Sequence, residues 1–131
     1  MINSNAFDYI NLLDKAADAS WLRNDAISNN IANVDTPGYK REDVTFQSEL
    51  QRAMQFSGGA SVDERVRELG RNSNSLSART YKDYQGYSYR LDGNNVDNET
   101  EQAMLAKNQL MYEGLMNSIS QEFKNLQTVI K

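Results

Sequence analysis

The densest run of oxygen-bearing side chains in the sequence is Asp92-Gly93-Asn94-Asn95-Val96-Asp97, and carboxylate and amide oxygens are ligands that calcium prefers. A calcium loop of the EF-hand type needs a glycine at its sixth position and a bidentate glutamate at its twelfth. With Asp92 at the first position, those two places hold Asp97 and Ala103. The spacing therefore does not predict a calcium site, and Asp92-Gly93 predicts a turn instead.

A second group that could do chemistry consists of four tyrosines next to an arginine: Tyr81, Tyr84, Tyr87, Tyr89 and Arg90. Aromatic rings in such a run can stack on nucleic-acid bases or on sugars. The formal net charge of −4 opposes binding to nucleic acid, whereas contact with a glycan needs no charge and stays open. We favour the alternative that residues 81–89 form an irregular β-like hairpin bent at Gly86, with tyrosines leaning on a helix.

The sequence of 131 residues contains no cysteine and no histidine. This composition excludes disulfides, thiolate nucleophiles, imidazole bases and the usual zinc ligand sets. An enzyme would have to rely on carboxylates, lysines and tyrosines, such as Asp92 with Asp97, and their spacing does not favour this. We therefore expect no enzyme, no catalytic residue, no cofactor and no metal.

No run of about 18 apolar residues is present, so we expect no membrane insertion. The segment Met1 to Leu13 includes Asp8 and lacks both a basic start and a continuous apolar stretch, so it does not have the form of a cleaved secretory signal. If the protein leaves the cytoplasm, we expect an export route that recognises another feature.

The chain changes character between Ser28 and Arg41, which contains its single proline. Pro37 disfavours the helical region for Thr36, so a helix that enters from the N-terminal side must stop by about Asp35. Pro37-Gly38 predicts the centre of a type II turn, with Gly38 at positive φ. We expect Asn33 to take the left-handed position at the helix end.

The segment from Phe7 to Val34 has the periodicity of a long helix. Alternating steps of three and four residues give a nearly apolar stripe: Ile10, Leu13, Ala17, Ser20, Asn24, Ile27, Ile31 and Val34. A second row widens it: Leu12, Ala16, Ala19, Leu22 and Ala26, with Trp21 beside it. The second face could pack within a bundle or meet other subunits, and Asn24 could fix the register or be merely tolerated.

The last segment, Glu99 to Lys131, predicts a second long helix. Its stripe is Leu105, Asn108, Tyr112, Leu115, Ile119, Glu122, Leu126 and Val129, and the flanking rows hold Met104, Met111, Met116, Phe123 and Ile130. Asn98 with Glu101 predicts the cap at its start. Two such helices packed together leave apolar surface that a soluble monomer rarely exposes.

Between these helices, a short amphipathic helix is predicted from Thr45 to Gln55, and a capping box at Ser61 and Glu64 predicts another short helix that ends before Gly70. The segment from Arg71 to Ala78 is predicted to be a linker. The predicted fold is mainly α: long N- and C-terminal helices packed as a coiled-coil-like pair, with a short helix and an irregular, partly β-like middle segment. We expect an N-terminal assembly helix over 1–35, the middle segment over 36–98 and a C-terminal assembly helix over 99–131, with both ends forming one structural domain.

Two strings in this sequence resemble the bacterial flagellar rod and hook proteins. The signature turn comprises Ala32, Asn33, Thr36, Pro37, Gly38 and Tyr39. The C-terminal signature comprises Asp92, Gly93, Asn94, Val96, Asp97 and Asn108, and it is similar to that of the proximal rod proteins within this family. The resemblance covers about residues 1–50 and 90–131, and the middle from 57 to 89 matches nothing.

This resemblance implies a non-enzymatic structural subunit of the proximal rod of the flagellar basal body, which assembles helically and transmits torque. It implies export by the flagellar type III apparatus and a place on the periplasmic side of the inner membrane. The implied partners are copies of itself, other rod subunits, the adaptor proteins between membrane ring and rod, and transiently the export gate. The expected assembly faces are Ile10, Leu13, Ala17, Ile27, Ile31, Leu105, Tyr112, Leu115, Ile119, Phe123 and Leu126. The alternative is a soluble helical adaptor or chaperone-like binding module.

Overall fold

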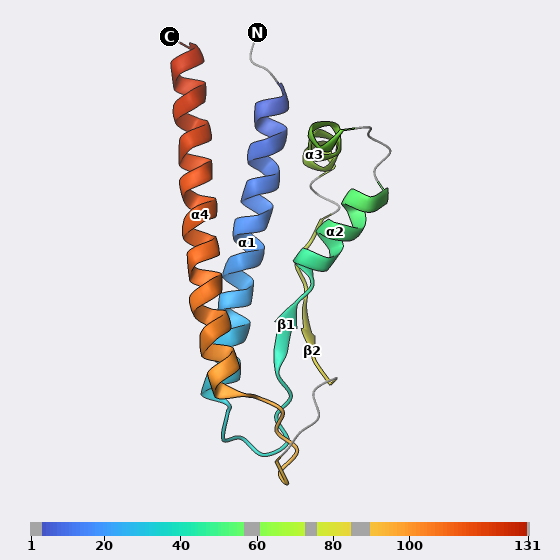
Figure 1. Cartoon of the computed structure of the whole chain (residues 1–131), viewed down its shortest axis with the longest axis vertical. Helices are drawn as coiled ribbons and strands as arrows, with labels where there is room; N and C mark the ends of the chain where they lie inside the picture. Colours follow the sequence, from blue (N-terminus) through green and yellow to red (C-terminus); the bar gives the residue numbers. More distant parts are fainter. Residues whose placement is uncertain (1–3, 57–60, 73–75, 85–89, 131) are drawn as a thin grey trace.

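The computed structural model describes residues 4–56, 61–72, 76–84 and 90–130. Two long helices dominate it, α1 (Ser4–Ala32) and α4 (Asn98–Ile130). They lie side by side and antiparallel, so that their outer ends meet at one end of the molecule and the turns lie at the other (Figure 1). The predicted mainly helical fold with a long terminal pair is confirmed.

The end of α1 follows from the proline and the glycine behind it. Gly38 has a φ of 71°, and the Tyr39 amide donates to the Thr36 carbonyl at 3.3 Å, as a type II turn requires. The helix itself ends at Ala32. The expectation for Asn33 was wrong, because no non-glycine residue among those described has a positive φ. Asn33 instead donates through Nδ2 to the Asn29 carbonyl at 2.8 Å.

The α1–α4 seam is formed by the two stripes that the periodicity predicts. All members of both stripes are buried or half-buried except Val129, which is 75% exposed. The polar exceptions Ser20 and Asn108 pair with each other: Ser20 Oγ donates to Asn108 Oδ1 at 3.1 Å, and Asn108 Nδ2 donates to the Ser20 carbonyl at 2.8 Å. A polar residue on each helix thus fixes the register of the seam, because an offset would leave both unpaired.

The middle segment contains β1 (Glu42–Val44), α2 (Phe46–Phe56), α3 (Val62–Arg71) and β2 (Thr80–Lys82). The two strands are antiparallel, with Asp43 opposite Tyr81. The predicted hairpin within 81–89 was therefore wrong about the partner of Tyr81, which pairs with a strand that follows the signature turn. Gly86, Tyr87 and Tyr89 lie outside the described residues.

The core lies on the other side of α1 from the seam. It joins Ala19 to one buried residue from each of α2, α3 and the segment before β2, namely Phe46, Leu69 and Leu76. Partly buried residues complete it: Leu12, Ala16, Val44, Leu50 and Ala78. The second row of α1 is thus covered in part by the chain itself. The segment predicted as linker also contributes Leu76 to this core, with 4% of its surface exposed.

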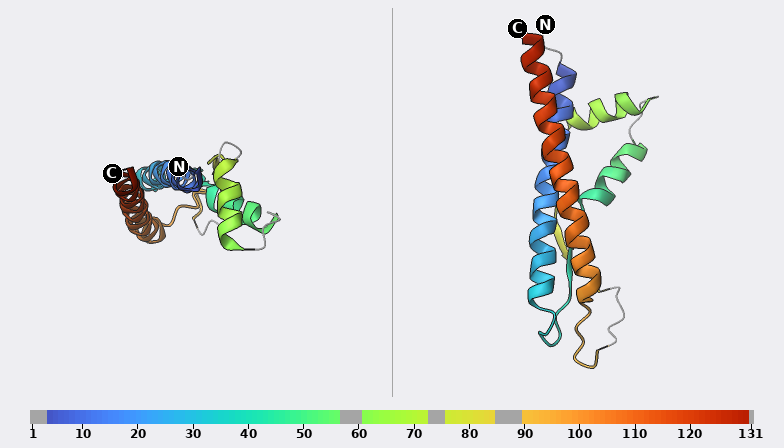
Figure 2. Two further views of the ribbon diagram at one scale, coloured as in Figure 1. Left: turned by 90° about the horizontal axis from the view of Figure 1, so that it is seen from above. Right: turned by 60° about the vertical axis from the view of Figure 1, so that its left-hand side comes forward.

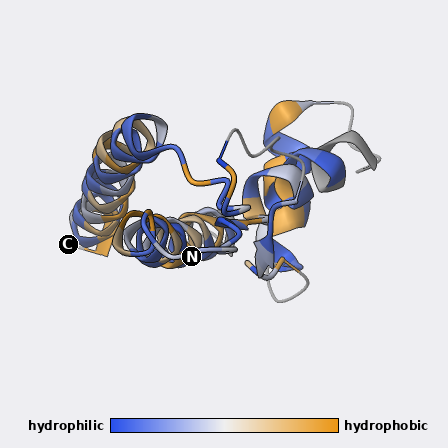
Figure 3. Cartoon of the chain, turned by 90° about the horizontal axis from the view of Figure 1, so that it is seen from below, coloured by the Kyte–Doolittle hydropathy of each residue, from blue (hydrophilic) through white to orange (hydrophobic). Residues whose placement is uncertain are grey.

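A glycine lets α3 reach α1. A Cβ added at Gly70 would lie 2.2 Å from the Asp8 carbonyl oxygen, so any side chain there would push α3 away. Gly70 lies within α3 rather than after it. In Figure 2, α2 and α3 stand out sideways from the helix pair, and we call these two helices the arm. Figure 3, seen from the end of the turns, shows the arm beside α1 and away from α4.

Of the two N-terminal caps that the sequence predicts for α3 and α4, one is confirmed. Ser61 caps α3 and accepts from the Glu64 amide at 3.2 Å, as predicted. The cap predicted at Asn98 for α4 was wrong. Asp97 takes that role, because its Oδ1 accepts from the Glu99 amide at 3.2 Å and its Oδ2 from the Thr100 hydroxyl at 2.7 Å.

Candidate functional site: a polar clamp and the exposed helix faces

The signature turn and the C-terminal signature lie against each other, although more than 50 residues separate them in the sequence. The Gly38 amide donates to the Asp92 carbonyl at 2.7 Å, and the Asn95 amide donates to the Tyr39 carbonyl at 3.4 Å. Gly93 has a φ of 79°, which a residue with a side chain rarely adopts. The two predicted strings therefore form one structural unit.

Asn94 closes the end of α1. Its Nδ2 donates to the carbonyls of Asn33, Val34 and Thr36 at 2.9, 3.1 and 2.8 Å. Its Oδ1 accepts from the Val96 amide at 2.8 Å, and only 1% of the residue is exposed. These carbonyls follow the end of α1, where the helix supplies no further donors, so this side chain provides hydrogen bonds that water would otherwise supply.

Asn30, which is fully buried, joins three chain segments. Its Nδ2 donates to the Glu42 carbonyl at 2.8 Å and to Glu101 Oε2 at 3.2 Å. Its Oδ1 accepts from the Glu42 amide at 2.7 Å and from the Tyr39 hydroxyl at 3.3 Å. Burial raises the pKa of Tyr39, and the charges of Glu42 and Glu101 add to this rise. Tyr39 therefore stays a hydrogen-bond donor at neutral pH.

Arg41 is the charged centre of the site. Its Nε donates to Glu101 Oε1 at 2.7 Å, its Nη1 to Asp83 Oδ2 at 2.8 Å, and its Nη2 lies 3.5 Å from Asp43 Oδ2. Burial lowers the pKa of Arg41, but the hydrogen bond to Glu101 and the surrounding carboxylates outweigh it, so the pKa is raised overall. Glu101, 1% exposed, would be a costly isolated charge without this guanidinium. We call Asn30, Tyr39, Arg41, Asn94 and Glu101 the polar clamp.

Sequence reasoning placed only Tyr39 and Asn94 of the polar clamp among the candidate site residues. Glu101 was interpreted as part of a helix cap, and Asn30 and Arg41 were not singled out. A signal was present, because Glu101 precedes Asn108 by seven residues and so continues the buried stripe of α4. A carboxylate on a buried stripe needs a cation, and Arg41 beside the turn was available.

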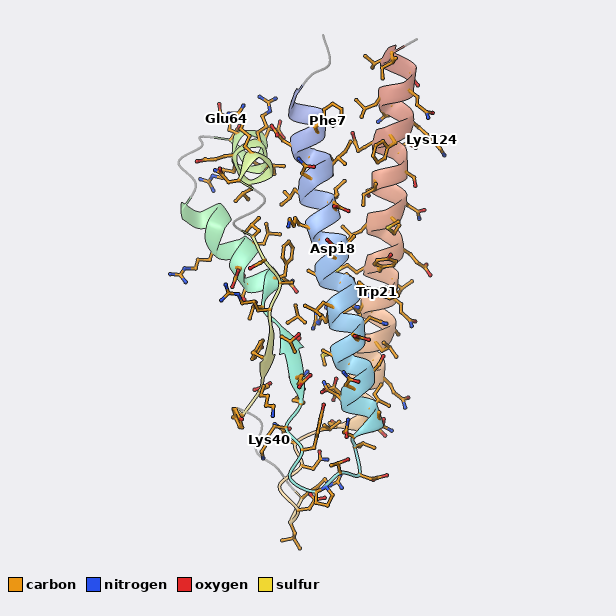
Figure 4. The ribbon with its side chains drawn as sticks, turned by 180° about the vertical axis from the view of Figure 1, so that it is seen from behind. Phe7, Asp18, Trp21, Lys40, Glu64 and Lys124 are labelled. Atoms are coloured by element: carbon orange, nitrogen blue, oxygen red, sulfur yellow. The ribbon has the colours of Figure 1, made fainter. Side chains whose placement is uncertain are left out.

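From the middle of the helix pair to the end with the helix termini, apolar side chains of both long helices are exposed. On α1 these include Phe7 at 45% and Trp21 at 63%, and the Trp21 and Tyr112 ring centroids are 6.0 Å apart. On α4 they are Leu110, Met111, Met116, Phe123, Val129 and Ile130. Figure 4 shows Phe7 and Lys124 near the same end of the helix pair, and Trp21 closer to its middle.

The predicted assembly residues divide between the seam and this exposed surface. Ile10, Ala17 and Ile27 are buried, and Phe123 is half exposed. The remaining ones are half-buried along the seam: Leu13, Ile31, Leu105, Tyr112, Leu115, Ile119 and Leu126. In this structure most of the set joins α1 to α4, and its contact with neighbouring subunits stays a prediction.

The part of the chain that the structure describes offers neither a metal site nor a membrane-spanning helix. Within residues 4–56, 61–72, 76–84 and 90–130, no three acidic side chains are grouped so that they could hold a metal ion. In the same ranges, none of the helices has both the length and the apolar character needed to cross a membrane.

Comparison with known proteins gives consistent matches. Residues 16–40 match a family described as flagella basal body rod protein. The chain is 36% identical over 129 residues to the flagellar basal body rod protein FlgB of Borrelia hermsii, with 93% of this chain and 95% of the relative covered. It is 33% identical to FlgB of Bacillus subtilis, over 90% of this chain and 89% of that protein. It is 31% identical to FlgB of Escherichia coli K12, over 83% of each.

Proposed function

Because the chain belongs to the FlgB family of flagellar basal body rod proteins and is a structural subunit of that rod, we propose that it joins its neighbours through the exposed apolar faces of α1 and α4. The polar clamp holds the two helices in the geometry that presents these faces. The single observation that carries this proposal is the exposure of large apolar side chains along helices that are otherwise well ordered by the seam and the clamp.

Three of the exposed side chains of α4 lie on the same side of the helix pair as Trp21. Met116, Phe123 and Ile130 recur every seven residues, so they lie in one row on α4. Met116 also follows Tyr112, the ring partner of Trp21, by four residues, which places this row beside Trp21. We call Phe7, Trp21, Met116, Phe123 and Ile130 the outer band.

Phe7 joins this band because of the register of the seam. Because α1 and α4 are antiparallel, the numbers of two residues at the same level have a nearly constant sum. The hydrogen bonds pair Ser20 with Asn108, a sum of 128, and Asn30 with Glu101, a sum of 131. Phe7 therefore lies level with positions 121 to 124 of α4, the turn that contains Phe123. Figure 4 agrees, since Phe7 lies at the height of Lys124. A band of this length matches the a/d surface that an additional helix covers in a coiled coil.

A contact of this kind supports an open assembly. The outer band lies on one side of the subunit, and its partner surface need not be the same band on another copy. A heterologous contact that does not close on itself produces a helical array, which is the form that a shaft requires. We propose that such packing transmits torque along the proximal rod, because the buried hydrogen bonds between α1 and α4, from Ser20 to Asn108 and from Asn30 to Glu101, resist sliding of the helices.

The proposal also covers the location of the subunit and its binding partners. We place the subunit on the periplasmic side of the inner membrane after export through the flagellar type III apparatus. Its partners there are copies of itself, other rod subunits and the adaptor proteins between membrane ring and rod, with the export gate as a transient partner. The relatives are structural rod proteins, which supports a subunit without catalytic activity and favours this role over the adaptor or chaperone alternative.

The test removes the outer band and leaves the clamp intact. We expect the double variant Phe123→Ser with Ile130→Ser to keep the wild-type helicity at low concentration, because both side chains are already exposed. Its concentration-dependent association in sedimentation velocity should be lost, and bacteria that express it should fail to swim. The matched control is Gln121→Ser with Asn125→Ser, two exposed polar positions on the same part of α4. Normal swimming by the band variant would contradict the proposal.

A further inference from the structure

A polar groove of about 400 Å³ lies between α1 and α4, and Trp21 is the residue of the outer band that lines it. It is lined by Ser20, Trp21, Asn24, Asn108, Gln109, Tyr112 and Glu113. A second, apolar groove of about 240 Å³ shares Ser20 and Asn108 with it and is bordered by α2. Since Ser20 and Asn108 form the seam between them, the polar groove opens on the face of the helix pair that is away from the arm.

The lining of the polar groove suits a cation with several N–H donors. Trp21 and Tyr112 present two rings whose planes are inclined by 50°, and a ring face attracts positive charge. Glu113 adds a carboxylate, and none of the lining residues is a lysine or an arginine. The groove thus holds one full negative charge that no lining cation neutralises.

Asn24 adds an acceptor that lacks a donor. Its Oδ1 is buried, and no hydrogen bond reaches it from the residues that the structure describes. A buried acceptor without a donor is unfavourable, so binding gains free energy when a donor reaches this oxygen. Asn24 was identified in the sequence as a polar residue in an apolar stripe. The structure gives it a position in the groove wall rather than a partner across the seam.

From this geometry we infer that the polar groove binds the guanidinium of an arginine carried by the arm of a second copy of this chain. The inference rests on the proposed function, because it requires that copies of the chain pack side by side. A guanidinium is planar and stacks on rings, and its five N–H groups form charge-assisted hydrogen bonds with a carboxylate such as that of Glu113. A lysine ammonium lacks the planar face.

The arm supplies suitable arginines. Arg52 on α2 and Arg67 on α3 are both exposed, and neither makes an ion pair or hydrogen bond with any residue in the described ranges. The arm extends from the side of the helix pair opposite to the groove, as the two grooves and Figure 2 indicate. An arginine on one side and its receptor on the other form a contact between successive copies that does not close on itself.

The first experiment tests the groove without assembly. Dilute protein is titrated with N-acetyl-arginine amide or with the neutral isostere N-acetyl-citrulline amide, and the Trp21 indole and Asn24 side-chain amide signals are followed by NMR. We expect arginine amide to shift both signals and citrulline amide to shift neither. Glu113→Gln should weaken arginine binding about tenfold. Equal shifts with both compounds would overturn the inference, because the groove would then not select a positive charge. No shift with either compound would also overturn it, because the groove would then hold only water.

The second experiment tests the partner by exchanging charges. Glu113→Arg should weaken self-association about tenfold in sedimentation, and combining it with Arg52→Glu or Arg67→Glu should restore it. Asp18→Arg is the control, since Asp18 is an exposed acid of α1 that does not line the groove and changes the net charge equally. Equal loss in both charge reversals, or no rescue by either arm variant, would overturn the arginine contact. The outer-band variants would still test the proposed function separately.

Discussion

The two ends of the helix pair differ in which side chains they bury and which they expose. At the end with the turns, Asn30, Asn94 and Glu101 are at most 1% exposed, and each makes hydrogen bonds to chain segments far apart in sequence. At the end with the helix termini, Phe123 is 50% exposed and Ile130 is 68% exposed. The end with the turns holds a buried, hydrogen-bonded polar network, with Leu91 exposed outside it, while at the other end apolar side chains of both helices are uncovered.

This difference separates the parts of the molecule that fix shape from the parts that are available to neighbours. A buried network with directional bonds specifies one arrangement of its segments. An exposed apolar row has no such preference and gains free energy from any surface that excludes water. The clamp therefore determines how the helices leave the turn, and association determines whether the far ends are covered.

The largest expected effect comes from breaking the clamp. Arg41→Met leaves the Glu101 carboxylate buried without its cation, so the free energy of unfolding should fall by about 3–5 kcal/mol. Val129→Ser at the open end should change it by less than about 0.5 kcal/mol, because that side chain is 75% exposed. Urea denaturation followed by circular dichroism measures both. Equal losses would show that the two ends do not differ in the way described.

The faces on which α1 and α4 meet were predictable from the sequence because helical spacing is a local property. The steps of three and four residues identified which residues of α1 and α4 face each other, and the polar exceptions Ser20 and Asn108 fell on both stripes. Pairing between them was not predicted, since spacing on one helix carries no information about register on the other. The structure supplies that register through their two hydrogen bonds.

The clamp was less predictable because its partners come from distant segments. Arg41 and Glu101 are separated by 60 positions, and only the fold brings them to 2.7 Å. The errors at Asn33 and Asn98 have a related cause. In each case another residue takes the capping role. Asn94, distant in sequence, donates to carbonyls just after the end of α1, and Asp97, one residue before Asn98, accepts hydrogen bonds at the start of α4.

The seam between the two ends should give an intermediate effect. Ser20→Ala removes the hydroxyl that donates to Asn108 Oδ1 and leaves that oxygen buried, so stability should fall by about 1–3 kcal/mol. Ser28→Ala is the matched control, because its hydroxyl donates to a carbonyl of the same helix on an exposed face. Thermal unfolding of both variants measures the difference. A control as destabilised as Ser20→Ala would show that the loss belongs to the helix and not to the seam.

The smallest effect concerns an exposed charge close to the clamp. Asp97 begins the same helix that carries Glu101, and the Thr100 hydroxyl and the Thr100 and Glu99 amides hold its pKa below the ordinary 3.8. Because its pKa is lower in the folded state, its contribution to stability is present above pH 3.8 and is lost as pH falls through the folded pKa. Thr100→Val removes the hydroxyl and keeps the amides, so the pKa of Asp97 should rise but stay below 3.8. Carbon-detected NMR titration of the carboxyl measures this, and an unchanged pKa would show that the amides alone hold it down.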